Sequence, residues 1–195
     1  MRLDDRQWAG LFLFLGGVQF SIFLIVAEAV DPPYSVSSNY ISDLGVRAGA
    51  PFFNASIAVF GIMAVIGAWF AFRALKDRIF LIVVVFAGVG IIGVGVFTED
   101  FPPLHAIFSF IAFVFAALSA VVAYRILRPP LSYVSVLLGL GSIVALILFV
   151  SHEYLKLGVG GMERMIVYPV LTWTLGFGGY LLGIGAQRPH PPDAP

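Results

Sequence analysis

Residues 79–96 read IFLIVVVFAGVGIIGVGV and contain no charged side chain. As a helix rising about 1.5 Å per residue, this stretch would be about 27 Å long, close to the roughly 30 Å of hydrocarbon in a bilayer. Five further apolar stretches of 20 to 25 residues accompany it along the chain. We therefore predict an all-α integral membrane protein with a bundle of six transmembrane helices. The predicted spans are Trp8–Val30, Phe53–Leu75, Ile79–Val96, Leu104–Tyr124, Leu131–Val150 and Met162–Ala186.

The composition agrees with a membrane protein. Hydrophobic residues make up 60 % of the chain and charged residues 11 %, whereas soluble domains average about 45–50 % and about 25 %. The segments between the spans are too short for a separate globular domain, so residues 1–187 are expected to form one domain, with 188–195 as a frayed cytoplasmic tail. The chain has no cysteine, which excludes disulfides and cysteine metal sites. It has no long basic run of the kind that binds nucleic acid.

The basic residues are sorted between alternate loops, and this sorting predicts the topology. Lys and Arg flanking the spans are retained on the cytoplasmic side. With six spans, eight of the 11 basic residues share the side of the two termini. We therefore expect a multi-pass protein of the cell membrane with both termini in the cytoplasm. Three basic residues, Arg47, Lys156 and Arg164, fall on the outer side, with most of the acidic residues.

The first span has an alternative interpretation as a cleaved signal peptide, because 27–29 read Ala-Glu-Ala, similar to a cleavage site. Its apolar run exceeds the about 7–15 residues usual in a signal peptide. The residues that precede it, 1–6, also lack a net side-chain charge. We expect the span to be retained as a membrane helix.

The first outer connection, Asp31 to Phe52, is longer than a turn between neighbouring helices requires, and such loops are often functional. We predict a short helix over Ser38–Leu44, lying across the outer mouth of the bundle. Asn39 and Asp43 are four residues apart and would share one face of that helix, pointing into the bundle. The alternative is that these side chains only cap turns in a solvated loop.

A second polar group spans the fourth predicted helix and the loop before it. Glu99 and Asp100 precede two prolines that predict a helix start, which places His105 in the first turn and Ser109 one turn deeper on the same face. His105 would be a metal ligand or a proton carrier. The alternative is a histidine bonded to a loop carboxylate or a backbone carbonyl.

A third polar group joins the fifth and sixth predicted helices. His152 follows the fifth, and Glu163 and Arg164 begin the sixth. Arg164, Tyr168 and Thr172 recur every four residues and predict a polar stripe on the wall of a cavity. The alternative is that Arg164 extends to the interface and that Tyr168 and Trp173 fill ordinary packing. Deeper in the sixth helix, Gly179-x-x-x-Gly183, with Gly176 and Gly185 nearby, predicts a close-packed face, internal in preference to one between two copies of the chain.

These segments also resemble a known family. The stretch Phe97–Ser109, with its acidic residues, prolines and histidine, is similar to the central motif of the uncharacterised membrane family catalogued as domain of unknown function 998. Gly160-x-x-Glu163-Arg164, with Trp173 nine residues beyond the arginine, resembles the motif of that family's last helix. The resemblance implies a six-helix bundle and leaves the chemistry open.

The residue types also resemble those of a superfamily of membrane hydrolases that use serine, aspartate and several histidines around zinc. The corresponding residues here are Ser109, Asp43, His105 and His152. A third histidine, His190, is predicted on the opposite side of the membrane. The resemblance implies catalytic roles for His105, Asp43 and Ser109.

Together, these groups predict an outward-facing pocket for a lipid headgroup or a small polar ligand. A divalent metal could be held by His105, His152 and Asp100, since carboxylates and histidines suit zinc or manganese. Arg164 is expected to pair with Glu99, Asp100 or Asp43, because an unpaired arginine near the membrane boundary is costly. Two alternatives remain open: a structural or assembly protein, and a small-solute transporter. The sequence leaves the oligomeric state open. The predicted ligand-binding residues are Asn39, Glu99, Asp100, His152, Glu163, Arg164 and Tyr168.

The topology can be tested with single cysteines, since the natural chain has none. Ala48→Cys should react with an impermeant maleimide added outside intact cells, whereas Lys76→Cys should not, because the eight-to-three distribution of basic residues places residue 76 inside. Equal labelling of the two variants, or the reverse order, would overturn the orientation.

Overall fold

The computed structural model describes residues 3–186, and every regular element in this range is a helix. Six helices are long and apolar enough to cross a membrane, so the predicted all-α fold is confirmed and the chain is a multi-pass membrane protein. The predicted tail 188–195, with His190, lies outside the described residues. The helices are α1 (Asp5–Ala29), α2 (Ala50–Leu75), α3 (Arg78–Val96), α4 (Pro102–Val122), α5 (Leu131–Val150) and α6 (Gly158–Ala186), with short 3-10 helices η1 (Ser42–Val46) and η2 (Ala123–Arg125).

The starts of α1, α3 and α4 are stabilised by capping side chains or by proline. Asp4 accepts a hydrogen bond from the backbone N–H of Gln7, and the Gln7 side chain accepts one from the backbone of Asp4, which satisfies free amides at the start of α1. Asp77 accepts bonds from two backbone amides at the start of α3. Pro102 and Pro103 begin α4, as predicted, because proline needs no backbone donor in the first helical turn.

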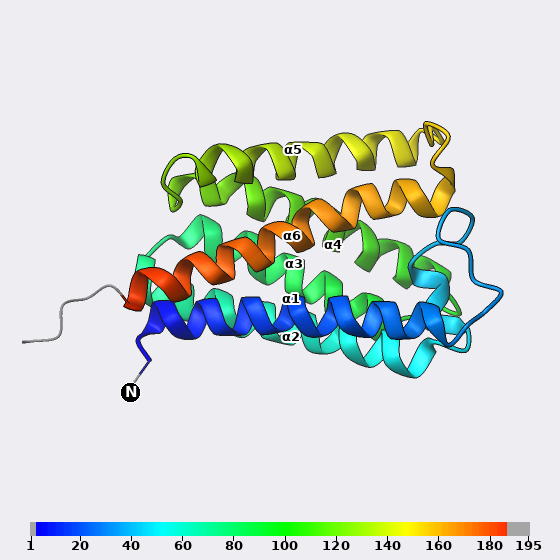
Figure 1. Ribbon diagram of the computed structural model, residues 1–195, viewed down its shortest axis with the longest axis horizontal. Helices are drawn as coiled ribbons and strands as arrows, with labels where there is room; N and C mark the ends of the chain where they lie inside the picture. Colours follow the sequence, from blue (N-terminus) through cyan, green and yellow to red (C-terminus); the bar gives the residue numbers. More distant parts are fainter. Residues whose placement is uncertain (1–2, 187–195) are drawn as a thin grey trace, which may run out of the picture.

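Five of the six helices surround the interior, and α5 lies outside them. Each helix packs on its neighbour in the chain, α1 also packs on α6, and α4 touches α6 directly. These contacts close a ring of α1, α2, α3, α4 and α6. Figure 1 shows α5 along one edge of the bundle, where it covers α4 and α6.

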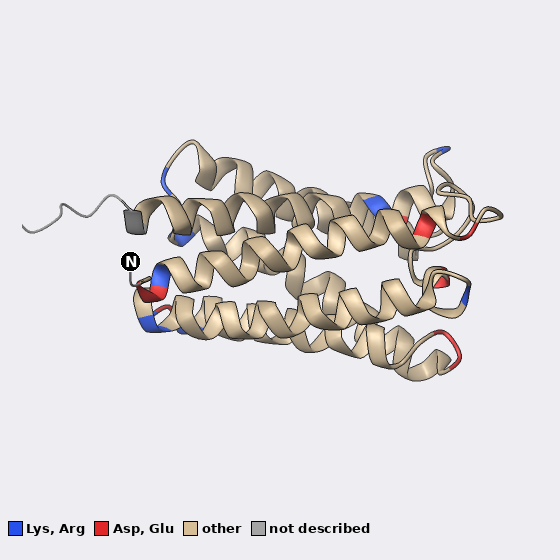
Figure 2. Cartoon of the chain, turned by 60° about the horizontal axis from the view of Figure 1, so that its bottom comes forward, with Lys and Arg blue, Asp and Glu red and all other residues tan. Residues whose placement is uncertain are grey.

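The two ends of the bundle differ in what they carry. The start of α1 and the end of α6 lie at one end, which we call the terminal end; the first long loop lies at the other, the loop end (Figure 1). Charged residues gather toward the two ends and are absent from the middle of the bundle (Figure 2). At the terminal end Arg73 pairs with Asp5 at 3.2 Å, and Arg125 pairs with Asp77 at 3.4 Å.

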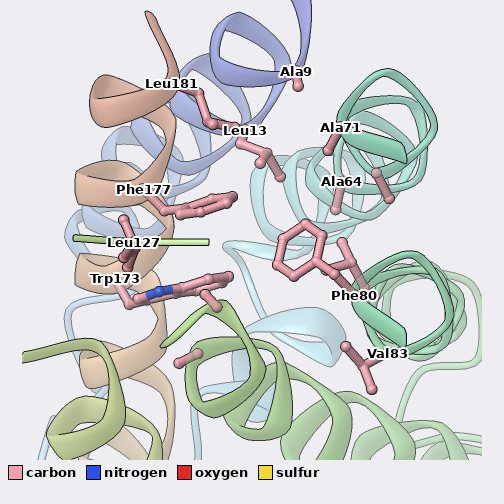
Figure 3. Packing of buried hydrophobic residues seen from close by; sticks show 14 residues of the cluster. Ala9, Leu13, Ala64, Ala71, Phe80, Val83, Leu127, Trp173, Phe177 and Leu181 are labelled. Atoms are coloured by element: carbon pink, nitrogen blue, oxygen red, sulfur yellow. The ribbon is translucent and has the colours of Figure 1, made fainter. Parts of the chain in front are cut away.

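Aromatic side chains fill the terminal half of the interior. Trp173 and Phe177 of α6 stack with ring centroids 5.2 Å apart, and Phe80 of α3 lies 5.2 Å from Phe177. Figure 3 shows the three rings together in the middle of the bundle. All three are buried, so this half of the interior is packed with apolar groups.

The close approach of α1 and α6 depends on glycine, but not on the glycines expected from the sequence. A Cβ at Gly178 would lie 2.8 Å from the backbone nitrogen of Phe14 and 2.9 Å from the carbonyl oxygen of Gly10. In contrast, a Cβ at Gly176, Gly179 or Gly183 would meet no described atom within 4 Å. The predicted close-packed face of Gly179 and Gly183 was therefore wrong, because helical rotation turns the adjacent Gly178 toward α1 instead.

The short helix in the first long loop exists, but it is a 3-10 helix over Ser42–Val46 and not a helix over Ser38–Leu44. The residues before it form a separate turn. The backbone N–H of Asn39 donates to the carbonyl of Ser35 at 2.8 Å, and the Asn39 side chain accepts from the Ser35 N–H at 3.0 Å. This local pairing competes with helix formation, so Asn39 remains outside the helix.

Two adjacent glycines provide a matched test of this packing. Gly178→Ala should lower the free energy of unfolding by about 1–3 kcal/mol, because the added methyl group forces α1 and α6 apart. Gly179→Ala should not destabilise the protein, since its methyl group meets open space and alanine favours a helix by about 1 kcal/mol. Chemical unfolding in detergent would measure both, and equal effects would contradict the packing described here.

Candidate functional site

The first long loop is tied down at both of its ends. Arg47, near the start of α2, forms an ion pair with Asp31, the second residue after α1. A second bond joins the Arg47 Nη2 atom to the Asp31 Oδ1 atom at 3.2 Å. Asp31 is buried, so this ion pair holds the loop against the bundle and is not a solvent-exposed surface pair.

Arg164 connects this loop to α1 and α6. Its side chain is only 5 % exposed. Its Nη2 atom donates to the Glu28 carboxylate and to the Tyr34 hydroxyl, each at 2.6 Å. Its Nη1 atom donates to the carbonyls of Val36 at 2.9 Å and Gly160 at 3.0 Å. Arg164 is thus paired with a carboxylate, as expected, but the partner is Glu28 and not Glu99, Asp100 or Asp43.

Tyr34 continues this network into the loop. Its hydroxyl donates to the carbonyl of Tyr40 at 2.9 Å while it accepts from Arg164. Burial raises the pKa of the Tyr34 hydroxyl to about 12, although the bond from Arg164 opposes the rise. Tyr34 therefore stays protonated at neutral pH and serves as both donor and acceptor.

The loop lies directly on the first turn of α6, where glycines allow the contact. The backbone N–H of Gly160 donates to the carbonyl of Ser37 at 3.0 Å, and a Cβ at Gly160 would lie 2.0 Å from the Asn39 carbonyl oxygen. Gly158 has φ +77°, a conformation that side chains disfavour. The motif Gly160-x-x-Glu163-Arg164 is therefore a docking site for the loop within this chain.

Glu163 points to the other side of the same helical turn. It is 5 % exposed, and its Oε2 atom accepts a hydrogen bond from the backbone N–H of Ile41. Among residues 3–186, no second group donates a hydrogen bond to this carboxylate. A buried carboxylate with one donor is poorly compensated for its loss of water.

Glu163 lies on the wall of a cavity of about 100 Å³ inside the ring of helices. Ile41 and Ser42 line its loop end, and Trp173 lines it ten residues farther along α6, or about 15 Å at 1.5 Å per residue. A water molecule needs about 10–15 Å³ of comparable space, so the cavity has room for several groups of that size. Its wall is mostly apolar, with contributions from α1, α2, α3, α4 and α6. The apolar lining includes Phe20, Phe53, Ile57, Phe60, Ile91, Val94, Phe113, Val167, Val170 and Leu171.

Polar groups on the cavity wall differ in whether they are satisfied. The hydroxyls of Ser119 and Thr174 each donate to the backbone carbonyl four residues earlier, at 2.7 and 2.8 Å. The indole N–H of Trp173 is buried and has no acceptor among the described residues. An unpaired buried donor costs about 1–3 kcal/mol, so a water or ligand acceptor at this position would be stabilised.

Two more carboxylates lie just beyond the loop end of the cavity. The Asn39 amide donates to Asp43 at 2.7 Å, but Asn39 lies outside the short helix and neither residue lines the cavity, so the two do not point into the bundle from one helical face as predicted. Burial raises the pKa of Glu99, a hydrogen bond from Ser42 opposes the rise, and the Asp43 carboxylate adds to it. Glu99 and Asp43 also interact electrostatically with Glu163. The loop end of the cavity is therefore acidic.

His105 and Ser109 form a hydrogen-bonded pair one turn apart on α4. The Nδ1 atom of His105 lies 2.8 Å from the carbonyl oxygen of Phe97, and its Nε2 atom lies 3.3 Å from the Ser109 Oγ atom. The carbonyl contact is the alternative that the sequence left open for His105. Ser109 also lines the cavity.

The remaining predicted residues lie elsewhere. Asp100 is exposed and accepts from Thr98 at 3.3 Å, and the exposed His152 bonds to the Tyr154 hydroxyl at 2.9 Å. Among residues 3–186, no three His, Asp or Glu side chains are grouped as ligands of one metal ion would be. The structure therefore does not bring His105, His152 and Asp100 together as the expected metal site.

Tyr168 is 41 % exposed and does not line the cavity, contrary to the predicted polar stripe. A step of four residues on a helix of 3.6 residues per turn advances about 40° beyond a full turn. The direction set by Arg164 therefore rotates toward the outside of the bundle at Tyr168. Val167 and Val170 face the cavity in its place.

Four residues of this site were not identified from the sequence: Glu28, Tyr34, Ser42 and Trp173. Glu28 could have been found, because a carboxylate at the end of an apolar span is costly unless it has a partner. Trp173 entered only as part of the motif that resembles the family's last helix, with no role assigned to it. Tyr34 and Ser42 carried no local signal, since their roles depend on segments distant in the chain.

Comparison with known proteins agrees with the resemblance seen in the sequence. The family described as "Protein of unknown function (DUF998)" matches residues 14–180, a stretch that contains every site residue described above. No curated protein and no solved structure matches the chain.

The importance of Arg164 can be measured directly. Arg164→Ala should lower the free energy of unfolding by about 3–5 kcal/mol, because removal of one partner of a buried pair leaves the other uncompensated. Arg73→Ala is the control. It breaks the half-exposed pair with Asp5 and should cost about 0–1 kcal/mol. Similar losses in chemical unfolding would mean that the Arg164 contacts contribute no more than a surface pair.

Proposed function

The chain belongs to the DUF998 family, whose function is unknown, and we propose that it binds a small amphiphile inside the bundle. The apolar chain of the ligand occupies the cavity, and its head group lies at the loop end beside Glu163. The observation that carries this proposal is the cavity itself, which combines an apolar wall with one incompletely bonded carboxylate at its loop end.

The apolar wall supports a ligand with an alkyl portion. Ligand pockets are usually lined by hydrophobic and aromatic side chains with a few polar groups that set orientation. The cavity extends along the bundle, so it suits a narrow chain better than a compact polar solute. This refines the pocket predicted from the sequence, where only the polar groups had been recognised.

The acidic loop end supports a head group that is cationic or rich in hydrogen-bond donors. Glu163, Glu99 and Asp43 interact with one another, whereas the nearby cation Arg164 already has four partners. An anionic head group would meet repulsion there, and an amine would offset the cost of the buried carboxylate. In the predicted topology, this head group faces the outside of the cell.

The packed terminal half supports binding in preference to passage through the membrane. Trp173 lines the cavity, and Phe177 and Phe80, which do not line it, fill the interior next to Trp173 (Figure 3). Transporters usually place ionisable groups or broken helices near the membrane midplane, whereas the charges here stay at the two ends (Figure 2).

Trp173 offers a direct reporter of binding. Trp8 and Trp69 are exposed, so the double substitution Trp8→Phe and Trp69→Phe leaves the cavity tryptophan as the only fluorophore of its kind. In nanodiscs, ω-bromo-octylamine should quench Trp173 saturably, because its alkyl chain enters the cavity. Octyl sulfate carrying the same bromine should bind more weakly, since its head group is anionic.

Two variants with matched controls test the two parts of the site. Ala116→Phe should abolish saturable quenching because it fills the cavity, whereas Ala106→Phe on the exposed face of α4 should not. Glu163→Gln should weaken amine binding about tenfold or more, since a bond to a charged group contributes about 1.5–3 kcal/mol. Glu153→Gln, an exposed carboxylate, should have no effect. Saturable quenching in Ala116→Phe would contradict the cavity as the binding site.

A further inference from the structure

The hydrogen bond between Ser109 and His105 differs from those of several other hydroxyl groups in the helices. In a membrane helix, a serine or threonine hydroxyl commonly donates to the backbone carbonyl four residues earlier. Three residues here do so: Ser21 bonds Gly17, Ser119 bonds Phe115 and Thr174 bonds Val170. The Ser109 hydroxyl instead meets the imidazole of the residue four positions earlier.

The contact with Phe97 determines which imidazole nitrogen carries the proton. A carbonyl oxygen can only accept, so the Nδ1 atom of His105, 2.8 Å from the Phe97 oxygen, must donate. In the neutral ring, the Nε2 atom then has a free lone pair and accepts from the Ser109 hydroxyl. The Ser109 hydroxyl, the His105 imidazole and the Phe97 carbonyl are therefore hydrogen-bonded in a row, as a nucleophile, its base and the group that orients the base.

The position of Ser109 matches the expected position of a reactive bond. Ser109 lines the cavity together with Ser42 and Glu163, which lie at its acidic loop end. In an acylated amphiphile, the carbonyl group lies where the apolar chain meets the polar head. A ligand with its chain in the cavity and its head beside Glu163 would bring that carbonyl toward Ser109.

From this arrangement, and resting on the amphiphile-binding function above, we propose that Ser109 is a nucleophile and His105 its general base. The reaction is hydrolysis of an ester that joins an apolar acyl chain to a cationic head group. Ser109 and His105 are therefore assigned as catalytic residues.

The proposed reaction proceeds in two balanced steps. The Ser109 oxygen attacks the acyl carbon while its proton passes to the Nε2 atom of His105, and that proton then goes to the oxygen of the departing head group as the C–O bond breaks. Water next attacks the acyl-serine and gives a proton to His105, which returns it to the Ser109 oxygen as the carboxylic acid leaves. The Glu99 carboxylate, which interacts electrostatically with His105, favours the transient imidazolium.

An alkyl fluorophosphonate tests the pair without knowledge of the natural substrate, because an activated serine displaces its fluoride and keeps the phosphonyl group. The full chain is reconstituted in nanodiscs of diether phosphatidylcholine, which offers no ester to the serine. Peptide mass spectrometry should find the adduct on Ser109. Ser109→Ala should lose it, whereas Ser21→Ala, whose hydroxyl is bonded to a backbone carbonyl on α1, should keep it.

The role of His105 is read from the rate of labelling. His105→Asn retains a side-chain donor for Phe97 but lacks the base, so labelling should slow by about 10²- to 10⁴-fold. Binding of ω-bromo-octylamine, followed in the same variants through Trp173, shows whether the cavity is intact. A His105→Asn variant that still binds the amine but labels slowly supports a base.

The other outcomes separate the two proposals. If the wild type binds the amine but Ser109 is not labelled, the nucleophile is overturned and the binding function stands. Labelling that is equally fast in His105→Asn shows proximity alone and overturns the general base. If neither amine binding nor labelling occurs in the wild type, both proposals fail.

Discussion

A guanidinium group buried at the loop end needs acceptors for its N–H groups, and this requirement organises the structure around it. The two Nη atoms of Arg164 meet this requirement, whereas its Nε–H has no acceptor among the described residues. Arg164 collects a carboxylate from α1, a hydroxyl and a carbonyl from the first long loop, and a carbonyl from its own helix. Loss of any of these acceptors would raise the free energy of the folded state, because an unpaired cation is unfavourable in a medium of low dielectric. The loop therefore has one position on the bundle. Since Glu163 precedes Arg164, the same helical turn that holds the loop also places a carboxylate under Ile41.

The six spans could be predicted because the bilayer imposes their length and hydrophobicity on each segment separately. The boundaries of α3 and α5 agree with the predicted spans almost residue for residue. The partner of Arg164 could not be predicted in this way. Glu28 lies 136 residues away in the chain, and the choice between it and the nearer-seeming Glu99 or Asp43 depends on how α1 and α6 pack. Local spacing placed Ser109 one turn from His105 on the same helical face, because the two are four residues apart. The same spacing was misleading for Asn39 and Asp43, because Asn39 lies outside the short helix.

The cavity left no trace in the sequence, because the residues that line it are those of an ordinary core. Apolar residues such as Phe60 and Val170 are expected at these positions whether they contact another side chain or line a cavity. Tyr168 was wrongly predicted to line a cavity. Its four-residue spacing from Arg164 suggested a common face, but helical rotation turns the Tyr168 side chain toward the outside of the bundle. Polar periodicity therefore located the end of the bundle that holds the site but not the direction in which each side chain points. Packing between helices, which a single sequence does not display, decides that direction.

A ring of five helices cannot have every neighbour antiparallel. Successive helices of the chain alternate in direction, so the ring formed by α1, α2, α3, α4 and α6 must contain one parallel pair, and α5 is the return passage that makes α4 and α6 that pair. Both helices begin at the loop end, as α2 does, and each helix start carries the partial positive charge of its dipole, about half an elementary charge. The acidic residues at the mouth of the cavity therefore face the positive ends of three helices. Because the number of ring helices is odd, the helix dipoles at this end partly neutralise its negative charge. This compensation comes from the backbone and does not require a basic side chain.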